Sequence, residues 1–155
     1  MDECAELNLN TIDQTIKLVI LFIRGWIGAC KFKDKLKLLT ARSNGMGYEQ
    51  RKKTLHNTIR GWVSYFKYAH AKTHLQAMDE WLRKRIRMCI WKSWKLPRTR
   101  VRNLIKCRIP LWRAYQWGNA SKGYWAVAGS FMQVAVSNRI LTGAGYPSLL
   151  GYSEK

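Results

Sequence analysis

Apolar residues recur at helical spacing along two long stretches in the middle of the chain. In residues 48–70 the apolar side chains are three and four positions apart, which places them on one face of a helix. These side chains are Leu55, Ile59, Trp62, Val63 and Phe66. The pattern predicts an amphipathic helix whose apolar face packs against the rest of the protein.

The second long stretch begins near Thr73. Thr73 is followed three positions later by Gln76, a pair that fits a capping box at the start of a helix. The helix is expected to end before Pro97, because a proline disfavours helical backbone in the residue before it. Apolar residues repeat on one face of this stretch: Leu75, Met78, Leu82, Ile86, Cys89 and Ile90.

The sequence before these two helices carries weaker signals. Residues 11–30 are apolar with little periodicity, and Gly25 and Gly28 weaken the helix that we expect there. Residues 31–39 alternate lysine with apolar residues, which suits a strand, but their lysines and leucines favour a helix. Residues 43–47 contain two glycines and are predicted to form a loop.

Short helical segments are expected after Pro97. A basic helix covers residues 98–106, and Pro110 starts a further turn of helix. A packed loop is expected at residues 143–151. Residues 121–141 are rich in glycine and alanine, and we expect four larger side chains to anchor them: Tyr124, Trp125, Phe131 and Val134. The fold class predicted from all these patterns is all-α, a bundle of short helices.

The positive charge of the chain points to a polyanionic partner. Lys and Arg number 28 against 9 Asp and Glu, which gives a formal net charge of +19 at pH 7 and a pI near 10.2. Because 47% of the residues are hydrophobic, this charge belongs to a chain that folds and not to a disordered tail. The charge attracts either nucleic acid or an anionic membrane surface.

The most basic segment is residues 83–108, with 11 Lys or Arg and no acid. Within it, Lys84, Arg87, Trp91 and Lys95 are three or four positions apart, so we expect them on the helix face opposite the apolar one. Cations hold RNA phosphates, and an exposed indole stacks an unpaired base. The segment is therefore the predicted RNA-binding surface. The alternative is an ordinary solvated helix face, with Trp91 in the core.

Catalysis and metal binding are not expected. Asp79 and Glu80 are adjacent acids that we place near a helix start, where they offset the helix dipole. His70 and His74 have no third ligand at a usual spacing, and His56 is expected to be a structural or surface histidine. No nucleotide-binding, hydrolase or metalloprotease motif occurs in the sequence. We therefore predict no catalytic residue, no metal, no small-molecule substrate and no cofactor.

Cysteine spacing and hydropathy favour a cytoplasmic protein. Cys4, Cys30, Cys89 and Cys107 form no C-x-x-C pair and are expected to be reduced. The longest apolar run, residues 18–23, is far shorter than the roughly 20 residues of a spanning helix. We expect no membrane span.

Four segments together resemble one protein family. They are TIRGWVSYF (58–66), DEWLRKRIRMCIWKSWK (79–95), KGYWAVAGS (122–130) and VSNRILTGAGYPSL (136–149). Their order and spacing resemble the maturase-specific region, thumb plus X domain, of group II intron reverse transcriptases. The resemblance covers about residues 31–152, and the combination of R-G-W-x-x-Y-F with R-x-R-x-x-x-W-K-x-W-K makes it fairly specific.

The resemblance implies a function and an organisation. In that family the region is all-helical and grips intron RNA so that the ribozyme reaches its splicing-competent fold. Residues 31–96 would form thumb-like helices, residues 97–155 the X region, and residues 1–30 a divergent segment. The expected RNA-binding residues are Arg60, Arg83, Lys84, Arg85, Arg87, Trp91, Lys92, Lys95, Arg98, Arg100 and Arg102. The expected core beneath them is Trp62, Tyr65, Phe66, Trp81 and Trp125.

Departures from the family pattern qualify this expectation. The family's fingers and palm, with their Tyr-x-Asp-Asp metal site, would precede this region, and residues 1–30 lack the stretch expected ahead of a thumb. We therefore expect a fragment of a reverse transcriptase/maturase that does not polymerise DNA, with any polymerase part supplied in trans. Arg108 stands where the family usually has a glycine before an aliphatic residue.

Other interpretations of the sequence stay open. The chain would be a non-functional remnant of a degenerate intron protein if it folds poorly without a polymerase. It would be a generic basic nucleic-acid binder if it does not discriminate between RNAs. Binding to anionic lipid through the basic face is the least favoured, because a lipid surface gives no reason for so many cations in loops and helix breaks.

Overall fold

Helices and their connections make up the part of the chain that the structure describes. The computed structural model describes residues 27–41, 45–66 and 72–153, and no strand occurs in these ranges. The prediction of an all-α fold is confirmed.

The chain divides into two compact units, residues 1–35 and residues 36–155. Residues 27–39 are helical, which confirms the helix predicted at residues 31–39. Of the helix expected at residues 11–30, the part before residue 27 lies outside the described residues.

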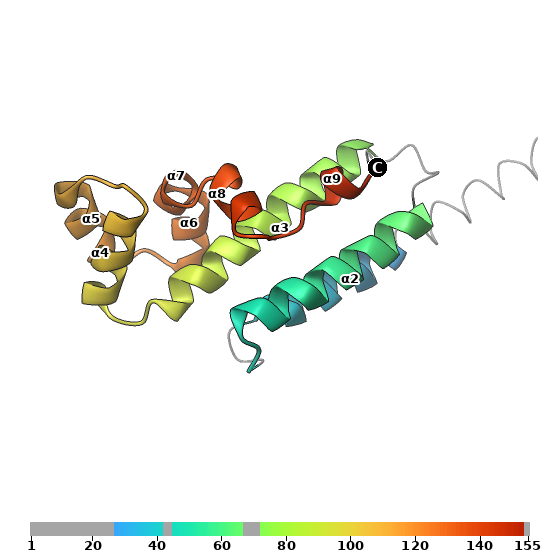
Figure 1. Ribbon diagram of the computed structural model, residues 1–155, viewed down its shortest axis with the longest axis horizontal. Coiled ribbons are helices and arrows are strands. Elements are labelled where there is room, and N and C mark those ends of the chain that lie inside the picture. Colours follow the sequence, from blue (N-terminus) through green and yellow to red (C-terminus); the bar gives the residue numbers. More distant parts are fainter. Residues whose placement is uncertain (1–26, 42–44, 67–71, 154–155) are drawn as a thin grey trace, which may run out of the picture. The chain divides into compact units, whose positions relative to one another are not determined.

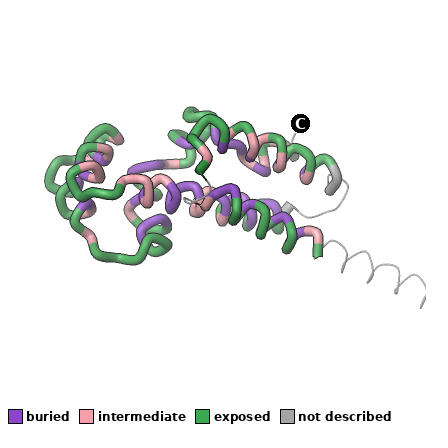
Figure 2. The backbone as a smooth tube through the Cα atoms, turned by 90° about the horizontal axis from the view of Figure 1, so that it is seen from below, coloured by how far each residue is buried: buried purple, intermediate pink, exposed green. Residues whose placement is uncertain are grey.

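Two long helices frame the larger unit. Helix α2 spans Tyr48–Phe66 and α3 spans Lys72–Ser93 (Figure 1). Buried positions recur along both helices at the predicted spacing (Figure 2). The buried apolar residues are Leu55, Ile59 and Val63 on α2, and Leu75, Met78, Leu82, Ile86, Met88, Cys89 and Trp91 on α3. Trp62 and Trp81 are half-buried, and the side chains of Tyr65 and Phe66 lie outside the described residues.

The start of α3 differs from the prediction. Thr73 lies inside the helix, because helical backbone already includes Lys72. A cap residue stands outside the helix with extended backbone, so the proposed Thr73–Gln76 capping box is wrong. The Gln76 side chain instead donates to Glu80 Oε1 at 3.5 Å. The helix ends before Pro97, as predicted.

Six short helices follow α3, and the first two lie where the sequence predicts a basic helix and a helical turn after Pro110. They are α4 (Pro97–Lys106), α5 (Leu111–Gly118), α6 (Tyr124–Gly129), α7 (Phe131–Ala135), α8 (Asn138–Gly143) and α9 (Leu149–Ser153). The packed loop expected over residues 143–151 is found as far as Ser148, with Tyr146 and Pro147 buried, and a helix then begins at Leu149.

Helix α3 is the surface on which much of the C-terminal half packs. Helices α6, α7 and α9 contact α3, and α9 also contacts α2. Figure 1 shows α6 to α9 gathered along α3. Helices α4 and α5 pack on one another. Their approach is close at Gly118, where an added Cβ would lie 2.6 Å from Cγ2 of Val101.

The anchors predicted for residues 121–141 are mostly wrong. Tyr124, Trp125 and Val134 are 46%, 41% and 64% exposed, whereas Phe131 is half-buried and stacks on Trp117. Small and medium side chains form the buried face instead: Val127, Ala128, Met132 and Ala135. Helices of five and six residues must approach α3 closely to bury any area, so their small residues turn inward and the bulky ones outward.

A row of polar residues on α3 holds the C-terminal segments. Asp79, Arg83 and Arg87 are spaced four apart and so share one face of the helix; we call them the polar stripe. Asp79 is 3% exposed, and its Oδ2 accepts from Arg83 Nε at 2.6 Å. Its Oδ1 accepts from the backbone N–H of Leu149, the first residue of α9, at 2.7 Å. We expected Asp79 to offset the helix dipole near the start of α3. It instead accepts a hydrogen bond from the first residue of a helix 70 residues further along the chain.

Arg87 continues the polar stripe one turn later. Its side chain is 4% exposed; Nε donates to the Val136 carbonyl at 2.8 Å and Nη2 to Asn138 Oδ1 at 2.6 Å. Val136 lies in the connection between α7 and α8, and Asn138 is the first residue of α8. This arginine thus acts as a clamp, because a buried carbonyl without a donor costs about 1–3 kcal/mol.

Two further arginines bind carbonyls at the end of the helix formed by residues 27–39. Arg51, from α2, donates to the carbonyls of Leu39 at 3.1 Å and Ala41 at 3.3 Å. Arg85, from α3, donates to the Lys37 carbonyl at 3.1 Å. Carbonyls in the last turn of a helix have no partner within it, and cations there also favour the helix dipole.

Helix α4 ends in a left-handed residue. Arg108 has φ 63°. Among the described residues, no other non-glycine residue has positive φ. Its N–H donates to the Ile105 carbonyl at 2.9 Å, and the N–H of Ile109 donates to the Leu104 carbonyl at 3.2 Å. This pair of hydrogen bonds is the Schellman motif, in which glycine is the usual left-handed residue. The backbone thus explains why a glycine is expected at this position from the family resemblance.

The left-handed turn gives a first prediction. Arg108→Gly should raise the free energy of unfolding by about 1 kcal/mol, because glycine adopts positive φ without the steric cost of a Cβ. Urea denaturation followed by circular dichroism measures the change. The matched control is Arg102→Gly, inside α4, which should lower stability by about 1 kcal/mol. A destabilised Arg108→Gly variant would contradict the assignment.

The Arg87 clamp gives a second prediction. Arg87→Met should lower the free energy of unfolding by about 2–4 kcal/mol, since Val136 and Asn138 lose a buried donor. Lys95→Met, at an exposed cation just after the same helix, should change stability by less than about 0.5 kcal/mol. Equal stabilities of the two variants in urea denaturation would show that Arg87 does not hold the fold.

Candidate nucleic-acid interface

Exposed cations follow one another across the α3–α4 connection and along α4. Val101 and Leu104 are buried on the inner side of α4, so Arg98, Arg102 and Lys106, each four positions after the last, lie on the opposite side. Lys95, in the connection before α4, is also exposed. We call these four residues, Lys95, Arg98, Arg102 and Lys106, the basic row.

Three of the expected RNA-binding residues belong to the basic row. Arg60, on α2, is also exposed. Lys106 was not among the expected residues, although its spacing from Arg102 is a signal that would have identified it.

Three other expected residues are half-buried cations over aromatic rings. Lys84 Nζ lies 4.4 Å from the centre of the Trp125 ring, and Lys92 Nζ lies 5.1 Å from that of Tyr124. Arg100 Cζ lies 4.6 Å from the centre of the Trp91 ring, and Arg100 Nε donates to the Trp94 carbonyl at 3.0 Å. An aromatic face holds a cation in place without neutralising it, so these charges remain effective at the surface.

The other expected cations turn inward. Arg83 pairs with Asp79, Arg85 binds Lys37 and Thr40, and Arg87 is the buried clamp. The expectation that Arg87 lies on an exposed face is wrong, because α7 and the segment after it cover that side of α3. Burial lowers the pKa of Arg85 and of Arg87, but both remain charged because a guanidinium titrates far above neutral pH.

Trp91 is also not an exposed platform. Its side chain is 1% exposed, with Trp94 and Phe131 in edge contact at 5.9 and 5.4 Å and Arg100 over its ring. Of the two alternatives for this residue, the core position is the one found. Trp125, expected in the core, is 41% exposed. Spacing alone could not separate the two indoles, because their burial depends on how α6 and α7 dock on α3.

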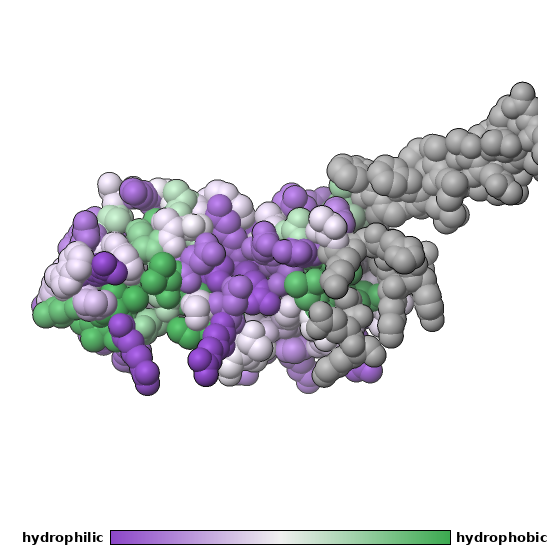
Figure 3. Space-filling model, turned by 90° about the horizontal axis from the view of Figure 1, so that it is seen from above, coloured by the Kyte–Doolittle hydropathy of each residue, from purple (hydrophilic) through white to green (hydrophobic). Residues whose placement is uncertain are grey.

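Acidic side chains are absent from a long part of the sequence around the basic row. Residues 81–153 contain 14 Lys or Arg and no Asp or Glu. Of the two carboxylates just before this range, Asp79 is buried and paired with Arg83, whereas Glu80 is exposed. Figure 3 shows hydrophilic side chains gathered over the middle of one face, next to a hydrophobic area toward α4 and α5. The field over this part of the surface is therefore positive.

Helix α5 exposes a small apolar and aromatic patch. Leu111, Trp112 and Tyr115 are 61%, 63% and 56% exposed, and the Arg113 guanidinium lies 4.8 Å from the centre of the Trp112 ring. The sequence predicts the helix but not the side of it that faces outward, because its inner side is made of Ala114 and Gly118.

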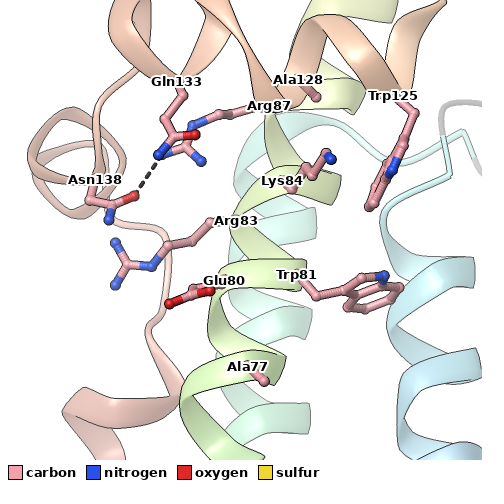
Figure 4. A pocket seen from close by; sticks show the side chains of 11 residues that line it. Ala77, Glu80, Trp81, Arg83, Lys84, Arg87, Trp125, Ala128, Gln133 and Asn138 are labelled. Atoms are coloured by element: carbon pink, nitrogen blue, oxygen red, sulfur yellow. Dashed lines mark hydrogen bonds between the residues drawn. The ribbon is translucent and has the colours of Figure 1, made fainter.

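A hollow of about 540 Å³ lies over α3 between α6 and the α7–α8 segment. Trp81 and Lys84 of α3, Trp125 and Gly129 of α6, and Gln133 of α7 are among its lining residues. Figure 4 shows Trp81 and Trp125 on the same side of α3, with the Lys84 ammonium pointing toward Trp125. Lys84 passes directly over Gly129, where an added Cβ would lie 2.8 Å from Lys84 Cε.

The described residues offer little for other chemistry. They contain no group of three His, Cys, Asp or Glu that could hold a metal ion. Burial raises the pKa of the Cys107 thiol, which keeps it protonated and unreactive. His56 is structural: its ring is hydrogen-bonded to the Tyr152 hydroxyl and to the Gly145 carbonyl. No helix in the described ranges has the length and hydropathy needed to cross a membrane.

Comparison with known proteins identifies the family. The model of the group II intron maturase-specific domain matches residues 29–108. No curated protein matches the sequence. The matched residues include α2, α3, α4 and the whole basic row. Because the match covers more than half of the sequence, the chain belongs to the family of the group II intron maturase-specific domain.

Proposed function

We propose that this protein binds group II intron RNA and helps the RNA reach its splicing-competent fold. The observation that carries the proposal is the family match over residues 29–108. The electrostatics support it, because the matched residues include the basic row and belong to a chain of net charge +19. No catalytic role is proposed, and the protein acts by binding.

The proposed mechanism is the neutralisation of phosphates that approach one another in the folded RNA. Each cation that binds a phosphate releases condensed counterions, which supplies affinity for any RNA. The fixed spacing along α4 adds geometry, since Arg98, Arg102 and Lys106 on one side of the helix present a line of cations to the RNA backbone. Such positioning favours RNA conformations that bring phosphates to that line.

The proposed RNA contacts follow the exposure of the side chains. They are Arg60, Lys84, Lys92, Lys95, Arg98, Arg100, Arg102 and Lys106. Arg83, Arg85 and Arg87 are left out because their guanidinium groups bind the protein itself. Trp91 is left out because its ring is buried.

The setting of the module is part of the proposal. The resemblance to thumb and X regions suggests that the protein works beside a polymerase part, carried on the same chain or another. Cys30, Cys89 and Cys107 are free thiols, which supports work in a reducing, cytoplasmic compartment.

The test is a binding measurement with charge variants. The wild-type protein should bind a folded group II intron RNA at least about tenfold more tightly than an equally long structured RNA at near-physiological salt. Replacement of Lys95, Arg98 and Arg102 by Gln should weaken intron binding and lower the slope of log affinity against log salt by about 2–3, one phosphate contact per cation. Filter binding across a salt series measures both.

The control uses exposed cations outside the basic row. Lys53→Gln with Arg139→Gln removes two charges from α2 and α8, and it should leave the preference for the intron unchanged. Equal affinity of the wild-type protein for both RNAs would identify a generic basic nucleic-acid binder. A wild-type chain that aggregates without a cooperative melt would support the non-functional remnant.

A further inference from the structure

The hollow over α3 has the size of a small-ligand site and not of a helix groove. Its volume of about 540 Å³ lies within the range of roughly 300–1,000 Å³ found for pockets that hold small molecules. A nucleotide is a ligand of that class, whereas an RNA duplex is much too large to enter. The hollow therefore admits one group that projects from a larger partner.

Its lining combines aromatic surface with a positioned cation. Trp125 is 41% exposed and Trp81 is half-buried, so each presents part of an indole to the hollow. Lys84 Nζ is held 4.4 Å from the centre of the Trp125 ring. Gly129 leaves the space through which the Lys84 side chain reaches that position, because any Cβ there would overlap it.

The cation is available to a ligand. Among the described residues no carboxylate forms an ion pair with Lys84, whereas Arg83 and Arg87, which also line the hollow, are occupied by Asp79, Val136 and Asn138. Figure 4 shows the Arg87–Asn138 hydrogen bond on one side of α3 and the two indoles with Lys84 on the other. Lys84 and the exposed part of Trp125 are therefore the groups of the hollow that are open to a ligand.

We propose that this hollow receives one unpaired nucleotide of the bound RNA. The base takes the place of the Lys84 ammonium on the Trp125 indole, with Trp81 at the other end of the hollow, and the displaced ammonium contacts the phosphate. A paired base cannot enter, because its neighbours in the duplex cover both of its faces.

This inference rests on the proposed function in that it takes RNA as the partner, but it concerns a different property. The basic row binds phosphates of any RNA conformation. The hollow distinguishes an unpaired nucleotide from a paired one. Peptides or small aromatic molecules are other conceivable occupants, and the experiment separates them by measuring the RNA directly.

The experiment uses the full-length protein and two labelled hairpin RNAs. One hairpin carries a single bulged 2-aminopurine, and in the other the same nucleotide is paired. We expect the wild-type protein to bind the bulged hairpin about tenfold more tightly, as one stacked base provides. Binding should also quench the 2-aminopurine fluorescence, and ultraviolet crosslinking should join the bulged nucleotide to the peptide that contains Trp125 or Trp81.

Variants test the residues. Trp125→Ala should reduce the tenfold preference to less than about twofold, and Trp125→Phe should restore part of it. Tyr115→Ala is the matched control, because Tyr115 is an aromatic residue of α5 that is 56% exposed and does not line the hollow. This control should keep the full preference. Thermal melting followed by circular dichroism confirms that each variant is folded.

The outcomes are distinguishable from failure of the proposed function. No preference of the wild-type protein for the bulged hairpin would overturn the inference even if the intron RNA is bound selectively. A preference that survives Trp125→Ala, with crosslinks on the α5 peptide that contains Trp112, would also overturn it. Conversely, the bulge preference with crosslinks at Trp125 supports the hollow even if intron and control RNAs bind equally, which would remove the proposed function alone.

Discussion

The buried carboxylate of Asp79 needs hydrogen-bond donors, and the way the C-terminal half packs on α3 depends on supplying them. A carboxylate at 3% exposure must be fully hydrogen-bonded, because an unpaired charge in the interior costs several kcal/mol. Arg83 satisfies one oxygen and the first N–H of α9 satisfies the other. The same face of α3 then places Arg87 against the α7–α8 connection. The polar stripe thus fixes two segments that have few apolar residues of their own to bury.

The abundance of cations serves two physical purposes in this protein. Arg51, Arg83, Arg85 and Arg87 bind carbonyls or a carboxylate of the chain itself. The planar guanidinium suits this work because it donates in several fixed directions. Lysines and arginines on the outer side of α4 remain in solvent and create the positive field. Net charge alone therefore overstates the number of residues that meet a nucleic acid.

Local spacing accounts for what the sequence could predict. The apolar faces of α2 and α3 and the position of α4 follow from periods of three and four and from the prolines, which act within one or two turns. The exposure of Arg98 and Arg102 follows in the same way from buried Val101 and Leu104.

Contacts between distant segments account for what could not be predicted. The partners of Arg87, and the Leu149 N–H that Asp79 binds, lie 49 to 70 residues away, so no local pattern marks these contacts. Trp91 and Trp125 exchange their expected environments for the same reason, since the docking of α6 and α7 decides which indole is covered. Arg108 lies between these two cases. Spacing predicts that α4 ends near it, but the only sign of its left-handed backbone in the sequence is that the resembled family usually has glycine there.

The hydrogen bond between Asp79 and the first residue of α9 affects the order in which the chain folds during its synthesis. The ribosome releases α3 well before Leu149 is made, so the carboxylate oxygen that Leu149 will bind stays hydrated until α9 has been synthesised. Closing a loop of this length costs entropy that local helix contacts do not repay. Docking of α9 on α3 is therefore a late step in folding, and a nascent chain that lacks Leu149 leaves this oxygen of Asp79 in water.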